Sequence, residues 1–132
     1  MIGLDTDVLL RSLLHDQGAE GVRARELVER RCAEQEPAVV NHVVLCEAVW
    51  VLARTYRYSR SQILQALVTI LATPAFLVPD RALVEEAMQI FQAGSADFAD
   101  ALIGVLNRNA GCATTYTFDR RAAEMAELSL VD

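Results

Sequence analysis

The sequence predicts an α/β fold, with a short central parallel sheet of about five strands flanked by helices on both faces. Short apolar segments alternate with longer segments of helical periodicity, a pattern typical of a buried parallel sheet covered by helices. The chain has 132 residues, of which 53% are hydrophobic, enough apolar material for a single core. Because no linker, repeat or low-complexity segment interrupts it, we expect residues 1–132 to form one domain.

The expected elements follow in order from apolar runs and capping residues. Short apolar runs predict strands over 2–5, 38–40, 76–78, 113–117 and 128–131. Leucines at helical spacing after Thr6 predict the first helix, and later helices are expected over 19–33, 42–55, 60–74, 81–93, 95–109 and 120–127. The helix boundaries are marked by residues typical of caps: Asn41, Ser59 and Asp80 before helices, Gly94 and Gly111 after them.

The chain is acidic, and its basic residues are all of one type. It has 18 acidic and 12 basic residues, which give a formal net charge of −6. This balance argues against a protein that binds nucleic acid through bulk electrostatics. It is compatible with carboxylates that are concentrated in one place and offset there by metal ions. All 12 basic residues are arginine, so the sequence contains no lysine.

The sequence also predicts a cytoplasmic protein with no membrane association. Its apolar stretches are broken by charges well short of the ~18 residues that a membrane span needs. The first residues show no basic region followed by a long apolar run, so no secretory signal is expected. Cys32, Cys46 and Cys112 are odd in number and lack metal-ligand spacing, which favours reduced thiols and argues against a zinc site.

Several acidic residues occur where a surface acid is unusual. Ligands bind at the carboxyl ends of parallel strands, and Asp5 and Asp119 each follow a predicted strand. Glu47 has apolar neighbours three and four positions away, so we expect its carboxylate on the buried face of its helix. Asp97 and Asp100 are three residues apart near a helix start and point roughly the same way.

Each of these acids alone also has a structural explanation. Asp5 and Asp119 suit helix caps, Asp97 suits a first-turn acid, and Glu47 could form a buried salt bridge with an arginine. Together they favour a cation site, because clustered carboxylates repel one another. Ligands that are all oxygen select Mg²⁺ or Mn²⁺ over zinc. Such a site commonly hydrolyses phosphodiesters, because the metal lowers the pKa of the attacking water.

Four segments in order resemble the acidic motifs of PIN-domain nucleases: 3–11 (GLDTDVLLR), 45–52 (LCEAVWVL), 97–103 (DFADALI) and 115–120 (TYTFDR). The resemblance spans nearly the whole chain, and the length suits VapC-like members, the toxins of type II toxin–antitoxin pairs. It implies a metal-dependent endoribonuclease in a PIN-like fold. The implied catalytic residues and ligands of Mg²⁺ or Mn²⁺ are Asp5, Glu47, Asp100 and Asp119, with Asp97 as an auxiliary acid. The implied partners are RNA, a VapB-like antitoxin that covers the acidic site, and a second copy in a homodimer.

Two further positions are compared with the family pattern. Thr117 resembles the family's hydroxyl residue two positions before the last acid, and we expect it to hold either that acid or a water on the metal. Asp7 departs from the pattern, which usually has asparagine there, so it adds a charge beside the site. Its place at a helix start suits N-capping, so we expect Asp7 to orient the loop that presents Asp5.

Positive charge near the site is expected to come from a few arginines. Arg120 and Arg121 directly follow a proposed ligand and are the best candidates for contacts with RNA phosphates; Arg11 is a weaker one. The alternative for each is an ordinary surface arginine. The sequence does not identify which RNA is cleaved.

Three other protein classes share part of this pattern. In a haloacid-dehalogenase-like phosphatase, Asp5 would be the nucleophile and Asp7 the general acid. That class and the receiver domains of two-component systems both depend on a lysine, which this chain lacks. A PIN-like binding module without catalysis remains open, and a cleavage assay with a chelator separates it from a nuclease.

Overall fold

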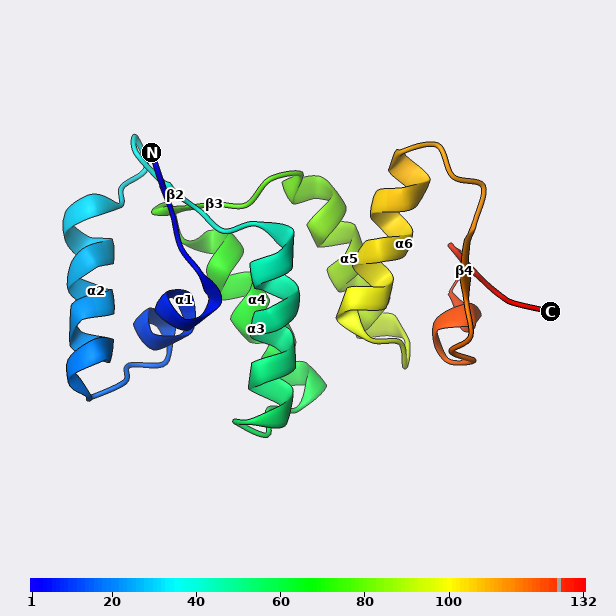
Figure 1. Cartoon of the computed structure of the whole chain (residues 1–132), viewed down its shortest axis with the longest axis horizontal. Helices are drawn as coiled ribbons and strands as arrows, with labels where there is room; N and C mark the ends of the chain where they lie inside the picture. Colours follow the sequence, from blue (N-terminus) through cyan, green and yellow to red (C-terminus); the bar gives the residue numbers. More distant parts are fainter. Residues whose placement is uncertain (126) are drawn as a thin grey trace. The chain divides into compact units, whose positions relative to one another are not determined.

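The computed structural model describes residues 1–125 and 127–132, which form two compact units, Met1–Pro79 and Asp80–Asp132. The chain runs through the first unit in the blue to green colours of Figure 1 and through the second in yellow-green to red. In each unit, short strands paired in parallel are connected through helices. The predicted α/β class is therefore confirmed.

The first unit holds a three-stranded parallel sheet in the order β1-β2-β3. Its elements are β1 (Ile2–Gly3), α1 (Thr6–Leu13), α2 (Ala19–Arg31), β2 (Ala38–Val39), α3 (His42–Arg54), α4 (Arg60–Ala72) and β3 (Phe76–Leu77). Ile2 pairs with Ala38, and Ala38 pairs with Phe76. Helix α1 packs against α2 and α3, and α3 packs against α4.

Local sequence explains where these helices begin. The Asn41 side chain accepts the N–H of Val44 at 3.0 Å. Ser59 and Gln62 form a reciprocal capping box. Behind the caps, each helix buries one stripe, and the largest fully buried side chains of the unit are Leu9, Val40, Leu45, Leu52, Leu67 and Ile70. The caps fix the helix starts, and the buried stripes form the core.

The second unit pairs two helices with a two-stranded parallel sheet. Its elements are α5 (Arg81–Ala93), α6 (Phe98–Asn109), β4 (Thr115–Thr117), the 3₁₀ turn η1 (Ala122–Glu124) and β5 (Leu128–Leu130). Phe91 of α5 and Phe98 of α6 meet edge to face with ring centres 6.2 Å apart. A Cβ added at Gly104 would lie 2.5 Å from Leu128 Cδ1, so glycine permits the close approach of α6 to β5. Gly111, with φ of 102°, ends the helix as predicted.

Several expected details differ from the structure. The five strands lie in sheets of three and two, because alternation along the chain predicts parallel pairing but not which strands are neighbours. Helix α6 begins at Phe98 instead of Ser95. Of the helix expected over 120–127, residue 126 lies outside the described residues, and the described part forms only the short turn η1. Asp80 precedes α5 but has left-handed backbone (φ 51°) and no side-chain capping bond. In the part of the chain that the structure describes, no helix has the length and apolar character needed to span a membrane.

Candidate active site

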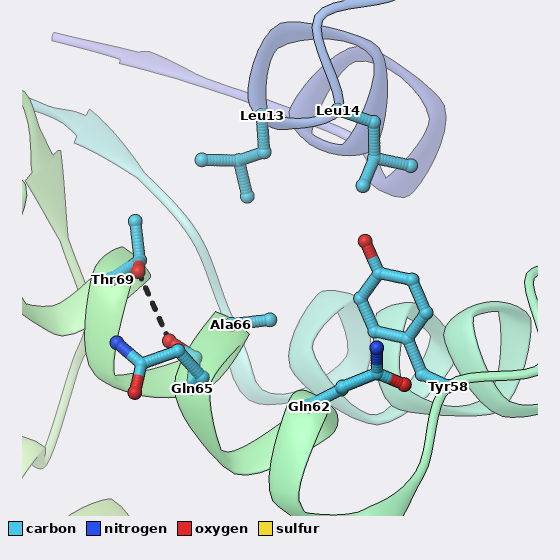
Figure 2. A pocket seen from close by; sticks show the side chains of 7 residues that line it. All are labelled: Leu13, Leu14, Tyr58, Gln62, Gln65, Ala66 and Thr69. Atoms are coloured by element: carbon cyan, nitrogen blue, oxygen red, sulfur yellow. Dashed lines mark hydrogen bonds between the residues drawn. The ribbon is translucent and has the colours of Figure 1, made fainter.

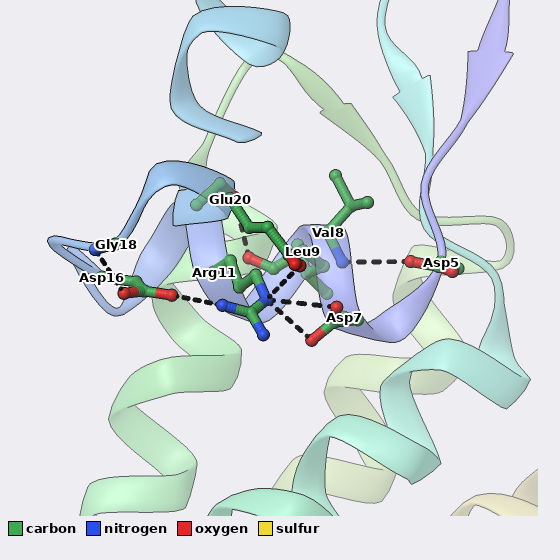
Figure 3. A network of polar contacts seen from close by, with 9 residues as sticks. Asp5, Asp7, Val8, Leu9, Arg11, Asp16, Gly18 and Glu20 are labelled. Carbon is green, nitrogen blue, oxygen red and sulfur yellow. Dashed lines mark hydrogen bonds and ion pairs between the residues drawn. The ribbon is translucent and has the colours of Figure 1, made fainter. Parts of the chain in front are cut away.

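Asp5 lies where β1 ends and α1 begins. Its Oδ1 accepts the N–H of Val8 at 3.0 Å, which makes Asp5 the N-cap of α1 (Figure 3). Within the described residues its second oxygen, Oδ2, has no hydrogen-bond partner. The capping role and a ligand role are therefore compatible: one oxygen fixes the side chain, and the other is exposed to solvent.

Glu47 lies on the exposed face of α3, and the expectation that it faces the core was wrong. Its flanking neighbours on that face, Val43 and Trp50, are 68% and 59% exposed. The buried stripe of α3 is instead formed by Val44, Leu45, Ala48, Val49 and Leu52. Because α3 carries apolar residues on both sides, its periodicity could not tell which side faces the core.

The contact that positions Glu47 is a hydroxyl group from α1. Thr6 Oγ1 donates to Glu47 Oε1 at 2.8 Å, and Thr6 directly follows Asp5. This bond ties the carboxylate of α3 to the end of β1. Among residues 1–125 and 127–132, Glu47 forms no ion pair, so the alternative of a buried salt bridge is also wrong. Sequence reasoning missed Thr6, although a hydroxyl residue beside a site acid is a recognisable pattern.

Asp7 does not cap α1, because Asp5 occupies that position. Both Asp7 carboxylate oxygens lie 3.1 Å from Nε of Arg11, one turn along the helix (Figure 3). Arg11 also pairs with Asp16 at 2.5 Å and with Glu20 at 3.5 Å. The hydrogen bond that Arg11 donates to Asp7, followed by the one it donates to Asp16, raises the pKa of Arg11 above its ordinary value. The extra charge that Asp7 adds beside the site is thus offset locally.

The same contacts change the interpretation of Arg11. Its guanidinium joins the first turn of α1 to the loop and helix that follow, through Asp16 and Glu20. Three carboxylates already offset its charge, so little of it is available to an RNA phosphate. Arg120 and Arg121, by contrast, are exposed, and in the described part of the chain neither forms an ion pair.

The second unit brings three of the predicted site residues close together. Asp97 precedes α6 with its side chain free of any capping bond, and Asp100 lies in the first turn. Burial raises the pKa of Asp100, and the negative charges of Asp97 and Asp119 raise it further. We call Asp97, Asp100 and Asp119 the acidic cluster; burial and the two neighbouring charges make the ionised form of Asp100 less favourable than that of an exposed aspartate.

Asp119 is held by the backbone of the turn that follows it. Its Oδ1 accepts the N–H groups of Arg121 at 2.8 Å and Ala122 at 3.2 Å. The N–H of Asp119 donates in turn to Thr117 Oγ1 at 3.0 Å. Thr117 therefore contacts the last acid, one of its two expected roles. As at Asp5, Oδ1 of Asp119 accepts hydrogen bonds from the backbone, and these bonds fix the orientation of the carboxylate and hence of Oδ2.

The donor chemistry of these residues fits a hard divalent cation. The proposed ligands offer only carboxylate oxygen, which Mg²⁺ and Mn²⁺ prefer. Burial raises the pKa of Asp100, and the negative charges of Asp97 and Asp119 add to this effect. Within residues 1–125 and 127–132, no three His, Cys, Asp or Glu side chains lie in an arrangement that could hold a metal ion. Asp5 and Glu47 belong to the first unit, and Asp97, Asp100 and Asp119 belong to the second.

The raised pKa of Asp100 predicts that Asp100→Asn stabilises the protein without metal. A carboxyl group whose pKa is raised by folding binds more protons in the folded state, so its unfavourable contribution appears as pH rises above the ordinary value. At pH 7.5 in EDTA, the variant should melt roughly 2–5 °C higher than the parent chain. The difference should shrink as pH falls toward 4. Thermal melts that include Glu29→Gln, an exposed acid outside the cluster, check this; a lower melting temperature for Asp100→Asn would contradict it.

A pocket in the first unit lies away from all of these acids. It has a volume of about 290 Å³ and lies between the end of α1 and helix α4 (Figure 2). Leu13 and Leu14 line it from α1, and the Tyr58 ring with Gln62, Gln65, Ala66 and Thr69 lines it from the other side. It contains no carboxylate, so it is suited to apolar contacts and not to metal-dependent chemistry.

Comparison with known proteins gives two findings. A family model of the PIN domain matches residues 2–128. A VapC ribonuclease of Aquifex aeolicus (strain VF5) is 27% identical over 118 residues, which cover 89% of this chain and 87% of that protein. The matched residues include all four acidic segments, 3–11, 45–52, 97–103 and 115–120.

Proposed function

The chain belongs to the PIN-domain family, and on that premise we propose that it is a Mg²⁺- or Mn²⁺-dependent endoribonuclease, the toxin of a toxin–antitoxin pair. The observation that carries this proposal is the match of the PIN-domain model to residues 2–128, which contain the four acidic segments in order. A bound cation would offset the charges of Asp97 and Asp119 that, after burial, raise the pKa of Asp100.

The proposed metal ligands are Asp5, Glu47, Asp100 and Asp119, with Asp97 as an auxiliary acid. A bound Mg²⁺ or Mn²⁺ would lower the pKa of the attacking water and place positive charge beside the scissile phosphate. No serine or cysteine nucleophile is then required. The residues of the chain have to hold these carboxylates in position and to orient the RNA.

The protein's own hydrogen bonds support this positioning role. Val8 N–H fixes Asp5, Thr6 fixes Glu47, and two backbone N–H groups fix Asp119. Each bond restricts the rotation of a proposed ligand, which lowers the entropy that metal binding costs. Arg120 and Arg121 are the proposed contacts with RNA, because they are exposed next to Asp119. Arg11 instead has a structural role, because its ion pairs with Asp16 and Glu20 connect α1 to α2.

The proposed partners follow the family. They are RNA as substrate, a VapB-like antitoxin that covers the acidic site, and a second copy of the chain in a homodimer. The exposed apolar side chains of Val43, Trp50 and Val68, and the pocket beside Leu13 and Leu14, offer surface on the first unit for such protein contacts.

Metal dependence is the direct test of the proposed function. We expect the purified chain to cleave single-stranded RNA with Mg²⁺ or Mn²⁺, to stop in excess EDTA, and to resume when the metal is restored in excess of the chelator. Asp119→Asn, purified in parallel, should be inactive and so excludes a contaminating ribonuclease. Cleavage of equal rate in EDTA would rule out the metal-dependent mechanism. A folded chain that binds RNA but never cleaves it would favour a PIN-like binding module.

A further inference from the structure

A pocket in the second unit adjoins the acidic cluster. It has a volume of about 300 Å³ and lies between the end of α5, the segment before α6, and the turn η1. Ile90, Ala93, Ala96 and Met125 give it an apolar lining. This volume is at the lower end for small-ligand pockets, so a single flat ring system suits it better than a larger ligand.

The pocket is bracketed in sequence by two of the proposed site acids. Ala96 directly precedes Asp97, and Arg121 follows Asp119 by two residues, with its backbone N–H bonded to Asp119 Oδ1 at 2.8 Å. Because Ala96 and Arg121 line the pocket, it lies next to Asp97 and Asp119 of the acidic cluster. A nucleotide next to the scissile phosphate would therefore have its base within reach of this pocket.

The polar groups of the pocket have opposite hydrogen-bonding character. Arg121 offers donors, and Glu124 offers acceptors. Ser95 Oγ donates to Glu124 Oε2 at 3.4 Å, which links the two sides of the pocket and leaves Oε1 without a partner in the described part of the chain. Guanine matches this pair, because its N7 and O6 accept from arginine while its neighbouring N1–H and N2–H groups donate to a carboxylate.

We propose that this pocket binds a guanine base of single-stranded RNA beside the cleaved bond, with Arg121 at O6 and N7 and Glu124 at N1 and N2. The inference rests on the proposed ribonuclease function and adds a base preference to it. Arg120, which is exposed and does not line the pocket, is then the contact for the phosphate.

Substrate substitution tests the proposal without altering the protein. Oligoribonucleotides of uridine and adenosine, each carrying one guanine, inosine, adenine or cytosine at the same position, are cleaved with Mg²⁺ and the cut is mapped. Inosine lacks only the 2-amino group, so we expect kcat/KM to fall about 5–10-fold, and about 10–100-fold for adenine. Equal cleavage of all four, or a preference for cytosine, overturns the guanine pocket but not the nuclease. No cleavage of any substrate overturns the proposed function itself.

Glu124→Gln tests the same contact from the protein side. The ratio of kcat/KM for the guanine and adenine substrates should fall toward one, because the variant loses the carboxylate that accepts from N1–H and N2–H of guanine. Damage to the fold would instead lower both rates together and leave the ratio unchanged. Glu29→Gln, an exposed acid on α2, should keep the parental ratio. An unchanged ratio in Glu124→Gln overturns the assignment.

Discussion

Asp5→Asn is expected to abolish RNA cleavage and leave the protein folded. Asparagine caps helices about as well as aspartate, so the bond from Val8 N–H to Oδ1 should persist and the melting temperature should change little. The carboxylate charge proposed to bind metal is lost. Removing a residue that only hydrogen-bonds to a metal ligand lowers metal affinity or activity roughly 10–100-fold. Removing a ligand itself should therefore lower kcat/KM by more than about 100-fold. Cleavage rates at saturating Mg²⁺, together with thermal melts, measure both effects.

Asp7→Asn is the matched control, with the same chemical change two residues away. Asp7 is 67% exposed, pairs with Arg11 and does not cap α1, so its replacement should leave most of the activity. Its ion pair is a solvent-exposed one within a single helix, which contributes little to stability. If Asp7→Asn were as inactive as Asp5→Asn, Asp7 would take part in the chemistry, as the general acid of a phosphatase does.

Local chemistry made much of the fold predictable. The starts of α3 and α4 follow from Asn41 and Ser59, whose capping bonds depend only on residues three positions ahead. The end of α6 follows from Gly111, whose positive φ disfavours other residues. The family expected from four ordered acidic segments is confirmed by the family model, because that pattern needs only order and spacing.

Features that depend on distant parts of the chain could not be predicted in the same way. The exposed side of α3 is set by which helices pack against it, and those contacts are formed by residues far away in sequence. The division of the strands into two sheets depends on strand order, which alternation does not specify. The bond from Thr6 to Glu47 joins residues 41 positions apart, and the pocket lined by Arg121 and Glu124 joins α5 to η1. None of these long-range arrangements produces a periodic pattern in the sequence.

Glu47→Gln is the second change for which we expect a large effect, again on activity and not on stability. Glu47 is exposed, and a glutamine amide oxygen can still accept the Thr6 hydroxyl, so the melting temperature in EDTA should stay within about 2 °C of the parent. A buried salt bridge would have predicted a loss of roughly 3–5 kcal/mol. Cleavage should nevertheless fall by more than about 100-fold, because an amide lacks the charge proposed to bind Mg²⁺.

Thr6→Val separates the charge of Glu47 from its orientation. Valine is β-branched like threonine but cannot donate to Oε1, so the carboxylate stays while the bond that positions it is lost. We expect cleavage to fall only about 10-fold, the effect of a partner that orients a ligand, and excess Mn²⁺ to restore part of it. Glu47→Gln should not be restored, because no added metal replaces the missing charge. If Glu47→Gln keeps the cleavage rate of Thr6→Val, then Glu47 does not bind the metal and only positions α1.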